Sequence, residues 1–176
     1  MIDIQLIQEF GSFFLDGLKT TLFIALFSCM LGIILGSLAG IVLTSNSKIL
    51  RGFVMSYVII IRGTPMYIQI TAIYFLLLYL GIAIPAVYSA ILSIGLNSGA
   101  YLSQIVVSGI KAVHKGQIDA AKVLGLSSYQ IATLIILPQA TRTMIPAFGN
   151  ELITLIKDSS LASTIGLDSS ICLPID

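Results

Sequence analysis

Long apolar stretches separated by short polar segments dominate the chain, and their lengths predict helices that cross a membrane. No Asp, Glu, Lys or Arg occurs from residue 20 to residue 47 or from residue 63 to residue 110. Each interval exceeds the roughly 20 residues that a helix needs to span the hydrocarbon core. The pattern therefore predicts an all-α protein with about four spans, at residues 18–44, 53–80, 87–110 and 129–156.

Small residues recur at helical spacing in the first and third of these spans. Gly32, Gly36 and Gly40 lie four residues apart, and Gly95 and Gly99 repeat the interval. Such a strip lets another helix approach closely, which is how helices pack in a membrane. We expect both spans to contact neighbouring helices through these faces.

Prolines interrupt the second and fourth spans. Pro65 has no backbone N–H and restricts Thr64, so the second span is expected to kink or to start afresh there. Pro138 and Pro146 predict that the fourth span is bent or broken. In lipid, such irregular backbone is tolerated only against protein or beside a water-filled cavity.

The first 17 residues have a different character. Ile2, Leu6, Phe10 and Phe13 recur at helical spacing among polar positions, which favours a short helix in the membrane interface. Residues 1–16 contain no Lys or Arg, and a secretory signal begins with a positive region. We therefore expect an interfacial segment at residues 1–17.

Composition agrees with a membrane protein and excludes some chemistry. Charged residues make up 10% of the chain, against about 25% in soluble domains. There is no phosphate-binding G-x-x-x-x-G-K-[ST] sequence and no metal-ligand spacing, and the two cysteines suggest no disulfide framework. Composition alone leaves a transporter, a channel, a receptor and a membrane enzyme open.

The basic residues gather in two loops, which sets the expected topology. One loop follows the first span and the other follows the third, and Asp119 is the one acid in the two loops. The basic residues are Lys48, Arg51, Lys111, Lys115 and Lys122. Loops rich in Lys and Arg face the cytoplasm. This rule predicts a cytoplasmic third loop and an N-terminus outside the cell.

Residues 116–150 contain the most specific local signals. The stretch 118–124 is long enough for two helical turns, and Gly125 is placed to end them in a left-handed cap. Ser127 and Gln130 have capping-box spacing and open the next helix. The apolar positions of the short helix have no lipid to bury against and are expected to need another protein (Ile118, Ala121 and Leu124).

This stretch resembles the cytoplasmic loop of permeases from binding-protein-dependent ABC transporters. Asp119-Ala120-Ala121 and Gly125 stand at the places of the family's Glu-Ala-Ala and Gly, with Asp for Glu. The runs LPQATRTMIPAFGNE and KDSSLAS are similar to the polar amino-acid branch of that family. The resemblance covers about residues 17–166.

The resemblance implies the permease subunit of an amino-acid ABC importer in a bacterial inner membrane. The implied partners are cytoplasmic ATPase subunits, an extracellular or periplasmic amino-acid-binding protein, a second permease subunit and membrane lipid, with no nucleic acid. The ATPase subunit binds the ATP, so no cofactor or enzymatic activity is expected here. The short helix would couple to that ATPase (Gln117, Asp119, Ala120, Ala121, Leu124 and Gly125).

A second group of residues is expected along the substrate path. Arg62 would cost about 2.5–3.5 kcal/mol at a bilayer centre, so it must snorkel, pair or face a wet cavity. Asn97 either joins helices or lines a cavity, and Glu151 and Asp158 either pair internally with Lys157 or bind substrate. The run Arg62-Gly63-Thr64-Pro65 is similar to a recurrent motif of amino-acid permeases. The residues expected along the path are Arg62, Thr64, Pro65, Met66, Tyr67, Asn97, Asn150, Glu151 and Asp158.

The chain also departs from the family. Gln104 and Val107 stand where a Glu and an Arg are usual. Residues 167–176 contain no apolar run of spanning length, although the family usually has a fifth span. We therefore expect an incomplete permease domain at 18–166 with a divergent tail. The alternative functions are a transport-defective or purely structural partner and, with little support, a membrane enzyme.

Overall fold

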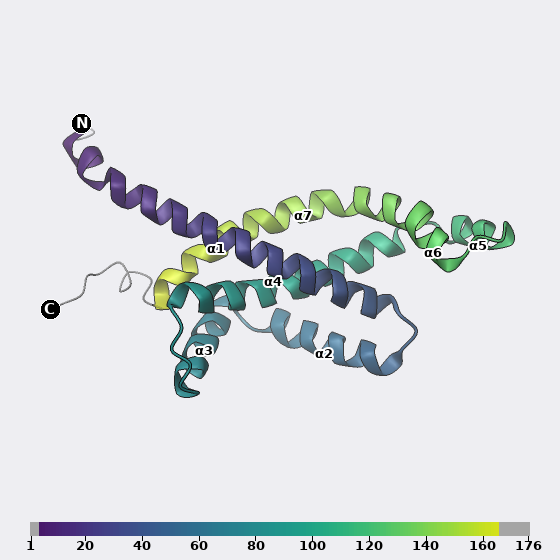
Figure 1. Cartoon of the computed structure of the whole chain (residues 1–176), viewed down its shortest axis with the longest axis horizontal. Helices are drawn as coiled ribbons and strands as arrows, with labels where there is room; N and C mark the ends of the chain where they lie inside the picture. Colours follow the sequence, from purple (N-terminus) through teal and green to yellow (C-terminus); the bar gives the residue numbers. More distant parts are fainter. Residues whose placement is uncertain (1–3, 166–176) are drawn as a thin grey trace.

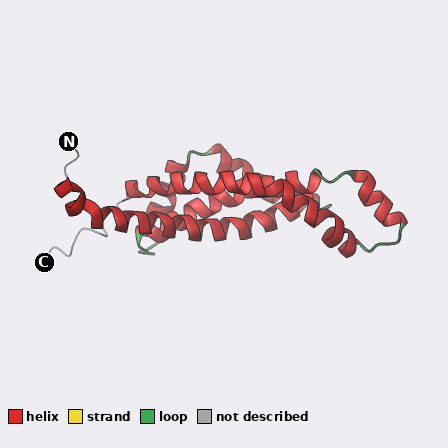
Figure 2. Cartoon of the chain, turned by 90° about the horizontal axis from the view of Figure 1, so that it is seen from above, coloured by secondary structure: helices red, strands yellow, loops and turns green. Residues whose placement is uncertain are grey.

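The computed structural model describes the backbone of residues 4–165 and the side chains of residues 15–162, and all of its regular structure is helical (Figure 2). The α-helices are α1 (Ile4–Thr44), α2 (Lys48–Gly63), α3 (Met66–Tyr79), α4 (Ala86–Lys111), α5 (Lys115–Val123), α6 (Ser128–Gln130) and α7 (Leu137–Ser159). A π-helical segment, η1 (Ile131–Ile136), precedes α7, and a 3₁₀ segment, η2 (Ser160–Ile165), follows it.

Membrane-spanning length separates these helices into two groups. Among the described residues, three helical stretches are long and apolar enough to cross a membrane, at Leu15–Thr44, Ala86–Lys111 and Ser128–Ala162. The pair α2 and α3 makes a fourth candidate if it counts as one bent span. The all-α fold with about four spans is thereby confirmed.

Helix α1 continues through residue 17 without a break. Its 41 residues correspond to about 60 Å at 1.5 Å per residue, twice the thickness of the hydrocarbon core. The separate N-terminal helix that the sequence suggested is therefore joined to the first span, while its interfacial position stays a prediction. Residues 1–3 and 166–176, which include the predicted tail, lie outside the described part.

Helix α4 is the centre of the bundle. It contacts α1, α2, α3 and α7, and Figure 1 shows α1 and α7 running along it. Half of its residues are buried, and many of these are small, including Ser93, Gly99 and Ala100. Small side chains explain how one helix accommodates several neighbours, because they bring the backbones close together.

The glycine strip of α1 was predicted to contact a neighbouring helix, and that helix is α4. A Cβ atom added to Gly36 would lie 2.5 Å from the Cβ atom of Leu102, and one added to Gly40 would lie 2.6 Å from that of Val106. Such distances are far inside van der Waals contact. No residue larger than glycine fits at these positions without separating the two helices.

The break after Arg62 is sharper than a kink. Helices α2 and α3 meet at 108°, with Thr64 and Pro65 extended between them. Pro65 cannot donate to the preceding helix, so the chain leaves the axis of α2 there. The second predicted span is therefore two helices, the second of which starts afresh at Met66.

The fourth span is not broken at either of its prolines. The helical path continues from α6 through η1 and α7, with Pro146 inside α7. Before Pro138 the helix changes to π-helical hydrogen bonds, which join residues five apart: the Leu137 N–H donates to the Ala132 carbonyl. A π-helical turn leaves room beside a proline ring, so the ladder adapts instead of breaking.

The bundle has two distinct ends. In Figure 1, α5 and α6 project at one end, beyond the body formed by α1, α4 and α7. The N-terminus of α1 and the end of α7 lie at the other. The loops with five of the basic residues therefore share the end that carries α5.

Candidate functional site

Helix α5 is bounded by three local structures that the residues themselves specify. His114 caps its start, with Nδ1 accepting from the Gly116 N–H at 3.2 Å. At its end Gly125 has φ +81°, and the Leu126 N–H donates to the Ala121 carbonyl at 3.1 Å. This is the left-handed cap that the sequence predicted. Ser127 and Gln130 then form the predicted capping box.

One face of α5 is held by the rest of the chain. Ala121 is only 3% exposed and lies on the side that contacts η1. The Gln139 amide donates to Gln117 Oε1 at 2.6 Å, which ties α7 to α5. The expectation that Ala121 needs another protein is therefore wrong, because its own chain covers it.

The C-terminal end of α5 carries two uncovered apolar side chains. Val123 is 88% exposed and Leu124 is 78% exposed. Asp119 is also exposed and pairs with Lys122 at 3.6 Å, and Ala120 is open. An exposed pair of this kind contributes little to stability. Val123 was missed by the sequence analysis, because it lies off the spacing of Ile118, Ala121 and Leu124.

Glu151 lies within electrostatic range of two other charged residues of the expected substrate path. The carboxylate of Glu151 is half-buried, and its charged neighbours are Arg62 and Asp158. The guanidinium of Arg62 stacks over the Tyr101 ring, 4.7 Å from its centroid. Helices α2, α4 and α7 thus bring together residues that are far apart in the sequence.

Neither acid of this group pairs with Lys157. Of the ion pairs between described residues, none involves Glu151, Asp158 or Lys157, so the internal pair considered for them is not formed. Ser98 has a buried hydroxyl beside the Glu151 carboxylate, without the geometry of an ordinary hydrogen bond. The cluster thus has polar capacity that the chain itself does not use.

Asn97 joins two helices. Its side-chain amide donates to Gln69 Oε1 at 3.2 Å, and the Gln69 amide donates to the carbonyls of Ile61 and Thr64 at 2.7 and 2.8 Å. Gln69 is buried and holds the α2–α3 break against α4. It belongs to no motif, so no signal in the sequence pointed to it.

The remaining residues expected on the substrate path do not converge. Met66 packs against the apolar core, and Tyr67 is half exposed. Thr64, Pro65 and Asn150 are exposed, and the Thr64 hydroxyl bonds to the Ile60 carbonyl of its own helix. In the described part of the chain, no group of three or more His, Cys, Asp or Glu side chains has the arrangement of a metal site.

Residues 32–175 match the family described as the binding-protein-dependent transport system inner membrane component. The match covers well over half of the chain. The chain belongs to this family. As a member it is a multi-pass membrane permease and a transport component without catalytic activity. Membership also implies ATPase and binding-protein partners.

Named relatives of this permease agree with the assignment. It is 36% identical over 155 residues to the glutamine transport system permease protein GlnP of Escherichia coli, covering 87% of this chain and 71% of GlnP. It is 38% identical over 156 residues to the arginine transport system permease protein ArtQ of Bacillus subtilis, covering 88% of this chain and 71% of ArtQ.

Solved structures share the fold. A crystal structure of an amino acid ABC transporter with histidines is similar over 95% of this permease and 78% of that chain, with a TM-score of 0.87 and 33% identity. An inward-facing structure of the MetNI methionine ABC transporter has a TM-score of 0.77 at 23% identity, over 90% and 76% of the two chains. The second likeness bears on the fold alone.

Proposed function

We propose that this permease subunit of an amino-acid ABC importer forms part of the path for a polar amino acid and couples it through α5 to a separate ATPase subunit. Relatives named for glutamine and arginine, and a related transporter crystallised with histidines, support cargo of this class. The observation that carries the coupling role is the exposed tip of α5, formed by Val123 and Leu124.

The tip suits a docking surface because it is both apolar and rigid. The Gly125 cap and the Gln117–Gln139 hydrogen bond hold α5 at the end of the bundle. A rigid surface loses little conformational entropy on binding, and buried apolar side chains at its centre supply most of the affinity. Motion of an attached ATPase would reach α7 through the same contacts.

The path for the amino acid is proposed to pass the cluster of Arg62, Glu151 and Asp158. A zwitterionic amino acid presents both charges, and this cluster offers both signs together with the Ser98 hydroxyl. Charged groups inside a membrane protein usually face a polar pathway. Since other residues expected on the path are exposed, we propose that a second permease subunit closes it.

The experiment is a reconstitution of the full chain with the ATPase and the amino-acid-binding protein of the same organism. The readouts are co-purification of the ATPase and ATP-driven uptake of radiolabelled glutamine. Leu124→Glu should lower both by about tenfold or more, because it places a charge at the centre of an apolar contact. Leu124→Met, which keeps the apolar surface, should retain both.

A second variant tests the geometry of the same contact. Gly125→Leu should separate ATP hydrolysis from uptake, because a Cβ atom resists the left-handed conformation by about 1–2 kcal/mol and reorients the tip. Insertion into the membrane, measured by the yield of purified chain, should stay near wild type.

Normal ATPase binding and uptake by Leu124→Glu, the first variant, would overturn the coupling role of α5.

A further inference from the structure

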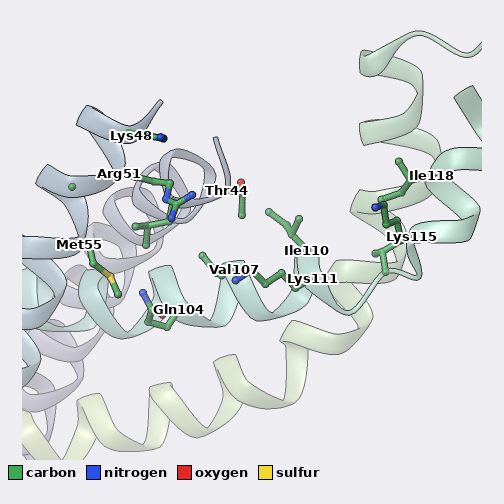
Figure 3. A pocket seen from close by; sticks show the side chains of 13 residues that line it. Thr44, Lys48, Arg51, Met55, Gln104, Val107, Ile110, Lys111, Lys115 and Ile118 are labelled. Atoms are coloured by element: carbon green, nitrogen blue, oxygen red, sulfur yellow. The ribbon is translucent and has the colours of Figure 1, made fainter. Parts of the chain in front are cut away.

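A cavity of about 670 Å³ opens between the last turns of α1 and α4 and the first turns of α2 and α5. Figure 3 shows the side chains of Arg51 and Lys111 extending into the space between α2 and α4. None of the residues proposed for coupling or for the substrate path lines it. The cavity therefore calls for its own explanation.

The walls of this cavity are strongly basic. Lys48, Arg51, Lys111 and Lys115 line it, and no Asp or Glu does. None of the four forms an ion pair with another described residue, since the pairs found there are Lys19–Asp16 and Lys122–Asp119. Four like charges around one space repel one another, so an anion between them would be stabilised by all four.

The N-terminal ends of two helices strengthen the positive electrostatic potential in the cavity. Lys48 and Arg51 lie in the first turn of α2, and Lys115 begins α5. The start of a helix carries a partial positive charge, which favours a bound anion and disfavours the lysines alone. Gln104 also lines the cavity, and a glutamate there, as the family resemblance suggested, would have supplied an internal counter-charge.

Apolar side chains also line the cavity. Met55 on α2 and Val107 and Ile110 on α4 lie beside the basic groups. The cavity also lies at the level where α1 and α4, both long enough to span the membrane, reach their ends. A ligand that matches both the basic and the apolar side chains combines an anionic headgroup with a hydrocarbon chain. Basic pockets between spans at the cytoplasmic side are suited to anionic lipids.

We propose that this cavity binds the headgroup phosphate of an anionic phospholipid, with an acyl chain along Met55, Val107 and Ile110. The site goes beyond the proposed transport function and needs neither the ATPase nor the substrate. Only the assignment to the cytoplasmic leaflet rests on the proposed orientation. Arg51 and Lys111 hold the phosphate from opposite sides, and Lys48 and Lys115 add to the field.

The chain contains no tryptophan, so one can be introduced as a reporter. Met55→Trp is placed in nanodiscs of phosphatidylcholine that contain an equal fraction of either brominated phosphatidylglycerol or brominated phosphatidylcholine. We expect stronger quenching by the brominated phosphatidylglycerol. Equal quenching by the two lipids would overturn the proposal.

Charge removal identifies the residues responsible. Adding Arg51→Gln and Lys111→Gln to the reporter should weaken the apparent affinity for phosphatidylglycerol by about tenfold or more, given the contribution of each basic residue near an anionic headgroup. Lys122→Gln is the matched control: it removes one charge at the same end, outside the cavity, and should leave the preference intact. A preference that survives the double change would refute the assignment of these residues.

Two further arms complete the test. Inorganic phosphate added to nanodiscs without phosphatidylglycerol should not change the reporter's emission; a saturable change would assign the site to a soluble anion instead of a lipid. Native mass spectrometry of the chain with Met55 retained checks that the tryptophan does not create the site. It should show bound phosphatidylglycerol that is lost in the Arg51→Gln, Lys111→Gln variant. Phosphatidylglycerol that stays bound to this variant would contradict the proposal.

Discussion

Glu151 is half-buried beside the Ser98 hydroxyl, in the field of Arg62 and Asp158. A carboxylate in a membrane bundle that pairs with no lysine is held there at a cost in solvation. Its oxygens keep the capacity to accept from an ammonium group or an amide. These features separate Glu151 from Asn97, whose amide is already used between α3 and α4.

Glu151→Gln should therefore raise the KM for uptake of glutamine by about tenfold or more, because a hydrogen bond to a charged group contributes about 1.5–3 kcal/mol. The change keeps the shape of the side chain, so ATPase co-purification should not alter. Uptake kinetics in reconstituted vesicles measure the effect. Lys157→Gln is the control, at an exposed lysine of the same helix that forms no ion pair with another described residue; an unchanged KM in Glu151→Gln would remove Glu151 from the path.

At the scale of elements, the α2–α3 break depends on one side chain. Gln69 donates to the carbonyls of Ile61 and Thr64 at the end of α2, and the Ile61 carbonyl also accepts the Thr64 N–H at 3.4 Å. In a membrane each unsatisfied backbone group costs several kcal/mol, because no water replaces the lost bond. Side chains of α3 and α4 thus add to the bonds that Thr64 makes within α2.

Gln69→Leu should lower the free energy of unfolding by about 1–3 kcal/mol, since it removes the buried amide that bonds to Ile61, Thr64 and Asn97. Thermal unfolding of the purified chain, followed by circular dichroism in detergent, should show a lower Tm. Thr71→Val on the same helix removes only a local bond to the Tyr67 carbonyl and should change little. Equal melting of Gln69→Leu and the unchanged chain would show that the break holds without this residue.

At the scale of the whole molecule, the distribution of charge predicts how the chain sits in the membrane. Five basic residues share the end that carries α5 (Lys48, Arg51, Lys111, Lys115 and Lys122). The loop between α3 and α4, which includes Ile82, lies at the start of α4 and has no charge. The positive-inside rule then places α5 in the cytoplasm and this loop outside.

Cysteine labelling tests this orientation after Cys29 and Cys172 are replaced by alanine. An impermeant maleimide applied to intact cells should modify Ile82→Cys, at an exposed position, and should spare Lys115→Cys until the membrane is permeabilised. The two positions serve as controls for each other. The reverse result would invert the topology and assign the basic cavity to the outer leaflet.

Local physical chemistry was enough to predict much of this protein from its sequence. The first and third spans follow from the length of uncharged intervals, and the close approach of a helix to α1 follows from the spacing of Gly32, Gly36 and Gly40. The end of α5 follows from Gly125, because only glycine adopts a positive φ without strain. Each of these signals acts within a few helical turns, so it can be read along the chain.

Other features were decided only when distant helices met. The burial of Ala121 depends on the contact between α5 and η1, and the role of Gln69 depends on the break at Thr64 and Pro65 and on Asn97. The unbroken fourth span depends on a change of hydrogen-bond register ahead of Pro138. The basic cavity needs the ends of four helices at once. Periodicity and composition carry no information about such pairings, because the free energy that selects them comes from contacts between segments that are far apart in the sequence.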